Sequence, residues 1–118
     1  MRRTALSLLF LAPTCGFAAA QDIGGNYTVE GTNFDGSPYR GTAQIVVTTE
    51  NTCRIVWNTG STSEGICMRY GPAFSAAYSS GNVVGLVIYE VMADGSLEGI
   101  WTVADTAGLG TEILRRAK

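Results

Sequence analysis

The sequence predicts an all-β protein in which eight antiparallel strands follow one another and close into a small barrel. Beyond Asn26, no segment spaces its apolar residues as a helix would over ten or more positions. β-Branched and aromatic residues instead recur in short runs separated by Gly, Asn, Asp and Ser. The links between these runs are short, which favours an up-and-down meander of neighbouring strands. A β-sandwich built from the same strands is the alternative.

Glycines at recurring places support closure of the sheet. The expected strands are residues 26–32, 39–49, 52–58, 63–69, 73–78, 83–91, 97–103 and 110–115. Glycines inside a strand mark places where the sheet bends or where a ring lies against backbone, so they predict strong curvature. The glycines within these strands that recur at a similar distance from a turn are Gly41, Gly65, Gly85 and Gly99. A strongly curved sheet removes its unpaired edges by closing on itself.

Two Asp-Gly-Ser turns form a weak internal repeat. Asp35-Gly36-Ser37 and Asp94-Gly95-Ser96 each lie between two expected strands, and Asp-Gly supplies the positive φ that a tight hairpin needs. If both turns are two-residue loops, Glu30 lies opposite Gly41 and Glu90 lies opposite Gly99. Each hairpin would then place an acid beside bare backbone.

The first twenty residues have the pattern of a cleaved export signal. Arg2 and Arg3 precede a mostly apolar stretch over residues 4–17, and Ala18 and Ala20 stand at the −3 and −1 positions before Gln21. The alternative, a membrane anchor, needs about 18 uninterrupted apolar residues, which this stretch lacks. We therefore expect a secreted or periplasmic protein whose single β-barrel domain spans residues 21–118, with no membrane span after cleavage.

Two cysteines remain after cleavage, and export exposes them to an oxidising compartment. Cys53 and Cys67 flank a turn-forming cluster centred near Gly60, so a hairpin sets them directly opposite each other. Opposed residues are close enough for a disulfide. A redox-active pair is the alternative, but the Cys-x-x-Cys spacing is missing. The sequence predicts one structural disulfide.

The composition excludes several functional classes. The 118 residues suffice for one small domain, and none is His, the commonest general base and metal ligand. The expected mature chain carries six basic and ten acidic side chains, with no basic stripe for nucleic acid. Its one lysine, Lys118, lies at the C-terminus. We expect no catalytic residue, metal site, cofactor or nucleic-acid partner.

Large rings and strand acids are the candidate functional residues. Rings at a barrel mouth can bind a ligand or partner at low entropic cost, although an eight-stranded barrel can also be filled by its two tryptophans. Glu30, Glu90, Glu98 and Glu112 lie within expected strands, where acids usually face water; two in one cleft could serve glycoside hydrolysis. The candidate ligand or partner residues are Tyr39, Trp57, Tyr89, Glu90 and Trp101.

Residues 83–91 are apolar on both alternating faces up to Glu90. A barrel strand with one face in water should alternate, so we expect its outer face to be covered. The C-terminal segment or a second copy of the protein could cover it, and this strand is the predicted homodimer or partner contact.

The hairpin motifs resemble those of avidin-like and other calycin barrels. The resemblance lies in Gly25-Asn26-Tyr27-Thr28, in Asp35-Gly36 with Tyr39 and Gly41-Thr42, and in the run from Asp94 to Trp101. Tyr27 stands where those families have Trp, and no biotin-contacting residue aligns, so no site residue is transferred. The chain is also similar to small exported bacterial proteins, some labelled fibronectin-binding, which implies export more than an activity.

Together these observations predict an exported, non-enzymatic binding or interaction module for a protein or a small apolar ligand. The alternative is an inhibitor of an envelope or secreted hydrolase that presents a rigid loop, with residues 33–38 and 104–109 as the longest candidates.

Overall fold

The computed structural model describes residues 23–118, and the predicted export signal lies outside this range. Eight strands follow one another and form a closed antiparallel barrel in sequential order. The predicted fold class is therefore confirmed. The strands are β1 (Gly25–Thr32), β2 (Pro38–Val47), β3 (Cys53–Asn58), β4 (Thr62–Tyr70), β5 (Ala73–Ser80), β6 (Val83–Val91), β7 (Leu97–Val103) and β8 (Thr106–Arg116).

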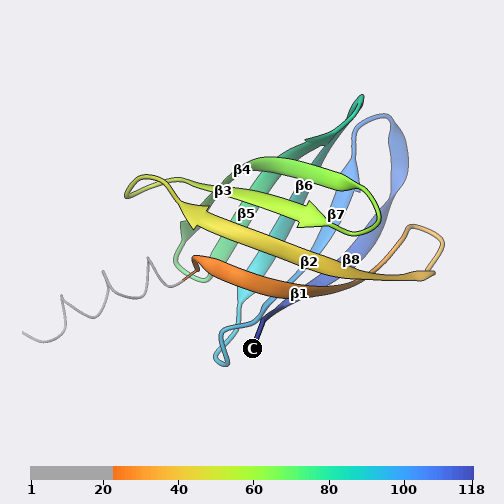
Figure 1. Cartoon of the computed structure of the whole chain (residues 1–118). Coiled ribbons are helices and arrows are strands. Elements are labelled where there is room, and N and C mark those ends of the chain that lie inside the picture. Colours follow the sequence, from red (N-terminus) through yellow and green to blue (C-terminus); the bar gives the residue numbers. More distant parts are fainter. Residues whose placement is uncertain (1–22) are drawn as a thin grey trace, which may run out of the picture.

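The ring closes where the last strand pairs with the first (Figure 1). β8 runs antiparallel to β1 from the Thr32–Thr111 pair to the Tyr27–Arg116 pair, so each of the eight strands has two hydrogen-bonded neighbours. Closure satisfies the backbone groups that an open sheet would expose at its edges. Residues 23–118 include no helix that is long and apolar enough to cross a membrane.

Side chains alternate between the barrel interior and the solvent, as a period of two residues requires. The interior is filled near the end where the chain enters, around Phe74 of β5, Leu97 of β7 and Leu114 of β8, each fully buried. Tyr27 closes this end, since its hydroxyl donates to the Ile23 carbonyl at 2.6 Å and the Arg116 guanidinium lies 5.0 Å from its ring centroid. This end of the barrel holds the hydrophobic core.

The two Asp-Gly-Ser turns adopt the same conformation, one residue longer than predicted. In the first, Asn33 N–H donates to the Ser37 carbonyl and Gly36 N–H to the Asn33 carbonyl; Met92, Ser96 and Gly95 repeat these bonds in the second. Gly36 and Gly95 have φ near +89° and +88°. Each glycine is therefore the residue in the left-handed region that ends a three-residue hairpin loop.

The longer loops shift both hairpins by one residue, so the predicted register was wrong. Glu30 pairs with Arg40 and Glu90 with Glu98. Both glutamates are exposed on the outer surface. A further correction concerns the link at 104–109, because β8 already begins at Thr106 and leaves a two-residue turn.

The strand glycines serve the two purposes that the sequence suggested. A Cβ at Gly85 would collide with the Tyr78 ring, whereas one at Gly41, Gly65 or Gly99 would collide with the backbone of a neighbouring strand. Neighbouring strands thus approach where no side chain intervenes, which lets a sheet of eight short strands curve into a ring.

The predicted disulfide is present and links β3 to β4. Cys53 and Cys67 are direct cross-strand partners, their Cα atoms are 5.0 Å apart, and the sulfurs are bonded. Both side chains point into the core and are 2% exposed. The bridge therefore fastens the β3–β4 hairpin from inside the barrel.

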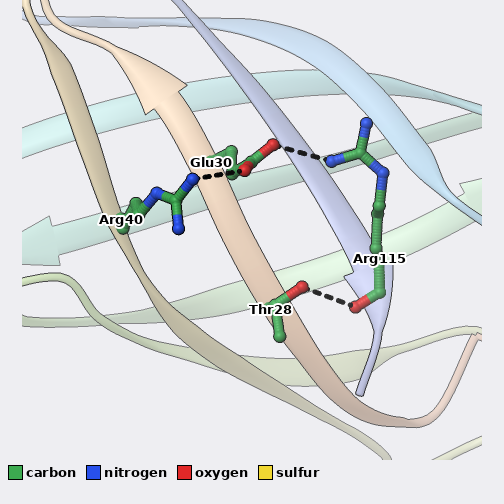
Figure 2. Close-up of polar contacts among 4 residues, drawn as sticks. All are labelled: Thr28, Glu30, Arg40 and Arg115. Atoms are coloured by element: carbon green, nitrogen blue, oxygen red, sulfur yellow. Dashed lines mark hydrogen bonds and ion pairs between the residues drawn. The ribbon is translucent and has the colours of Figure 1, made fainter. Parts of the chain in front are cut away.

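On the outer surface, one carboxylate spans the seam at which the barrel closes (Figure 2). Glu30 on β1 accepts from Arg40 of β2 at 3.2 Å and from Arg115 of β8 at 2.8 Å. Thr28 adds a bond to the Arg115 carbonyl at 3.4 Å. The three strands β2, β1 and β8 are thus joined by side chains as well as by backbone.

Replacement of Glu30 by Gln is expected to lower the free energy of unfolding by about 0.5 kcal/mol, because exposed ion pairs are well solvated. Urea unfolding at low salt measures the effect, and in about 1 M NaCl, where charges are screened beyond about 3 Å, it should vanish. Glu98→Gln, at an exposed strand acid, is the matched control. A loss of unfolding free energy above about 2 kcal/mol, or a loss that does not change with salt concentration, would contradict the interpretation of these contacts as exposed ion pairs.

The outer face of β6 is exposed, so the C-terminal segment, the first of the two expected covers, does not cover it. Val84, Leu86 and Ile88 are each more than half exposed. The C-terminal strand instead lies between β7 and β1. Ile100 of β7 is exposed directly opposite Ile88, and Ile66 and Met68 of β4 are exposed on the far side of β5, so an apolar band crosses this side of the barrel.

Candidate ligand-binding site

The barrel is hollow at the end opposite its core. A cavity of about 390 Å³ opens between the β1–β2, β3–β4, β5–β6 and β7–β8 turns. This volume lies within the range of small-molecule sites. The lining residues are Asn33, Tyr39, Trp57, Thr59, Ser61, Ser63, Tyr78, Ser80, Val83, Val87, Trp101, Val103 and Glu112.

Glycines on neighbouring strands keep this end open. Tyr39 lies against Gly31, Tyr78 against Gly85 and Trp101 against Gly110, each so close that a Cβ on the glycine would collide with the ring. The rings thus lie flat along the barrel wall instead of filling its centre. At this end the wall is aromatic and the middle is empty.

Two edge-to-face ring pairs border the cavity. Tyr39 and Trp101 meet with centroids 6.3 Å apart at 71°, and Trp57 and Tyr78 meet at 5.3 Å and 61°. Phe34, from the β1–β2 turn, stacks on Trp101 at 4.9 Å. Rings in edge-to-face or offset-stacked arrangements attract each other, so these contacts hold the rings in place along the cavity wall.

A buried carboxylate lies among the rings. Glu112 on β8 is 6% exposed. Its Oε1 accepts from the Tyr39 hydroxyl at 2.6 Å, and its Oε2 accepts from Trp57 Nε1 at 2.8 Å and from the Tyr89 hydroxyl. Trp57 Nε1 also lies 3.3 Å from the Tyr89 oxygen. Four strands, β2, β3, β6 and β8, therefore meet in one polar network.

Burial and this carboxylate shift the acidity of the surrounding tyrosines. Burial is the main cause, and the negative charge of Glu112 adds to it, because both disfavour a phenolate. The pKa of Tyr78 rises to about 12, and the pKa values of Tyr39 and Tyr89 are also raised. All three hydroxyls remain neutral hydrogen-bond donors at physiological pH.

Stability is expected to fall between pH 10 and 12. The pKa of Tyr78 is raised from 10.0 to about 12 by folding, so the unfolded chain loses its proton first and unfolding becomes more favourable as the pH rises through this interval. Urea unfolding at several pH values measures the slope. Tyr78→Phe should make it shallower. An unchanged slope in this variant, or a Tyr78 absorbance change near pH 10, would contradict the assignment.

Four of the five predicted binding residues lie in the barrel interior. Tyr39, Trp57 and Trp101 line the cavity, and Tyr89 is buried and bonds to Glu112. Trp57 and Trp101 border the cavity instead of filling the barrel. Glu90 is exposed on the outer surface opposite Glu98 and lies outside the cavity.

Sequence reasoning missed two residues of the site. The strand pattern groups Glu112 with acids that usually face water, and Tyr78, one of the large rings, is not among the five candidate binding residues. A spacing of two links Gly110, Glu112 and Leu114, which all face inward, but the apolar Ile113 between the last two hid the alternation. Glu112 is the one carboxylate among the cavity-lining residues, so the paired acids of glycoside hydrolysis are not assembled there.

No protein-family model matches this sequence, and no curated protein matches it either. Similarity is found to solved barrel structures. A redesigned β-barrel has a TM-score of 0.75 at 17% identity, covering 85% of this chain and 96% of that chain. The redesigned β-barrel mFAP1, bound to DFHBI, has a TM-score of 0.73 at 22% identity, covering 83% and 98%.

A third solved barrel is less similar in structure. The fatty acid transporter REP1-NXSQ has a TM-score of 0.54 at 17% identity, covering 84% of this chain and 98% of that chain. At these identities the similarity shows the fold alone. The expected likeness to calycin-type meander barrels therefore holds for the architecture, whereas the avidin-like sequence family and the fibronectin-binding label are not shown.

Proposed function

We propose that this protein is an exported, non-enzymatic binding protein that holds a small, largely apolar molecule in the open end of its barrel. The observation that carries the proposal is the cavity of about 390 Å³, bordered by Trp57, Tyr78 and Trp101. Ligand sites combine such apolar walls with a few convergent polar groups. Glu112 with its donors and the hydroxyl-bearing mouth supply these groups. Of the similar barrels named above, one is bound to DFHBI and one is a fatty acid transporter, and both are compatible with this use of the fold.

Binding and its location can be tested together. Naphthyl-sized probes, added to the protein while the indole N–H signals of Trp57 and Trp101 are followed by NMR, should shift both signals. Ser63→Phe, at an inward-facing cavity residue, should abolish the shifts. Thr62→Phe, at the exposed neighbour on the same strand, should leave them intact. Failure of every probe to bind, or binding indifferent to Ser63→Phe, would overturn the proposal.

Export is part of the same proposal and is supported by the pattern of residues 1–20. Mass spectrometry of protein recovered from the cell envelope or the medium should find a chain that begins at Gln21. Recovery of the uncleaved chain from the cytoplasm would contradict export.

A protein contact through β6 is the second role that we propose. The apolar band around Leu86 and Ile88 is exposed, and a second copy offers an equally apolar surface to cover it. Sedimentation should show a dimer that Leu86→Lys disrupts. A monomer that stays soluble at high concentration would contradict it. No observation favours the hydrolase-inhibitor alternative.

A further inference from the structure

The cavity contains a negative charge and no positive one. Glu112 lines it, and none of the other lining residues is Asp, Glu, Lys or Arg. The hydroxyls of Tyr39 and Tyr78 are protonated at neutral pH, because their pKa values lie above even the ordinary tyrosine value of 10.0. In the described part of the chain, both salt bridges involve Glu30 on the outer surface. The charge of Glu112 is therefore met by neutral hydrogen-bond donors alone.

This carboxylate retains capacity for one more donor. Oε2 accepts two hydrogen bonds, from Trp57 and Tyr89, whereas Oε1 accepts one, from Tyr39. An ionised carboxylate oxygen can accept two. A ligand N–H at the cavity floor would fill the remaining position without displacing any of the existing donors.

The mouth of the cavity has the same charge sign. The turns around the mouth are residues 33–37, 59–61, 81–82 and 104–105. They carry Asp35 and Asp105, both exposed, and contain no Lys or Arg. Most basic side chains of residues 23–118 lie toward the opposite end of the barrel, and Arg40 is held on the outer wall by Glu30. The field at the entrance therefore attracts cations and repels anions.

Aromatic walls around a carboxylate suit an organic cation better than a metal ion. Ca²⁺ and Mg²⁺ need several oxygen ligands, and one carboxylate lines this cavity. Ring faces attract an ammonium group, and Tyr39, Trp57, Tyr78 and Trp101 all border the space. A fatty acid, in contrast, would bring a second carboxylate toward Glu112 with no cation to compensate.

We propose that the ligand is a small organic cation, an ammonium group on a flat apolar body, bound with its N–H on Glu112 and its body between the ring pairs. This inference rests on the proposed function, since it names the ligand class of the same cavity. A cationic ligand would also explain why an acid is buried at a position where an apolar side chain would fill the barrel at a lower desolvation free energy.

Three probes that differ in charge test it by calorimetry and NMR: 2-(2-naphthyl)ethylammonium, 2-naphthaleneethanol and 3-(2-naphthyl)propionate. The ammonium probe should bind at least tenfold more tightly than the alcohol, and the propionate more weakly than the alcohol. In Glu112→Gln, the preference for the ammonium over the alcohol should fall to about onefold. Glu98→Gln, at an exposed acid on the outer wall, should retain the full preference.

The outcomes separate the two proposals. If the alcohol or the propionate binds as tightly as the ammonium to the unaltered protein, the cation inference is overturned while the binding function stands. If no probe binds, the binding function falls and the inference falls with it. The preference in the unaltered protein decides the matter even where Glu112→Gln fails to fold.

Discussion

Glu112→Ala is expected to lower the free energy of unfolding by about 3 kcal/mol. The change removes the acceptor shared by Tyr39, Trp57 and Tyr89 and leaves a void beside them. Each buried donor left without a partner costs about 1–3 kcal/mol, although Trp57 keeps the Tyr89 oxygen as an acceptor at 3.3 Å. Chemical denaturation measures the loss.

The matched control is Glu98→Ala, at an exposed strand acid on β7. Surface changes of this kind usually alter stability by no more than about 0.5 kcal/mol. If the two alanine variants were equally stable, the network around Glu112 would contribute nothing to the fold.

Reduction of the Cys53–Cys67 disulfide is expected to lower the free energy of unfolding by about 3 kcal/mol. The bridge closes a loop with a sequence separation of 14 and restricts the unfolded chain by about that amount. Denaturation of the oxidised and reduced protein measures the difference. The double variant Cys53→Ala, Cys67→Ala should lose at least as much, because both sulfurs are buried in the core. Equal midpoints for the oxidised and reduced protein would contradict this expectation.

The meander and the disulfide could be predicted because both depend on local rules. Turn residues divide the chain into short runs, and a period of two with a turn near Gly60 is enough to set Cys53 opposite Cys67. The register of the Asp-Gly hairpins could not be fixed in the same way. In both turns a serine N–H and hydroxyl bond to the preceding aspartate, at 2.9 and 2.7 Å for Ser37 and Asp35, and the loop takes an extra residue.

The site was harder to predict than the fold. The rings were evident from composition, but their placement around a cavity depends on glycines of neighbouring strands, such as Gly31 and Gly110, which meet Tyr39 and Trp101 only after the barrel closes. Burial of Glu112 depends on donors from three other strands. Such long-range complementarity leaves no mark in the local pattern around residue 112.

Intermolecular NOEs between a bound naphthyl probe and the protein test the central claim most directly, because they distinguish the cavity from the exposed apolar band. We predict contacts from the probe's ring protons to the indole groups of Trp57 and Trp101 and to the methyls of Val87, all of which line the cavity. Contacts confined to Leu86 and Ile88, on the outer face of β6, would contradict it.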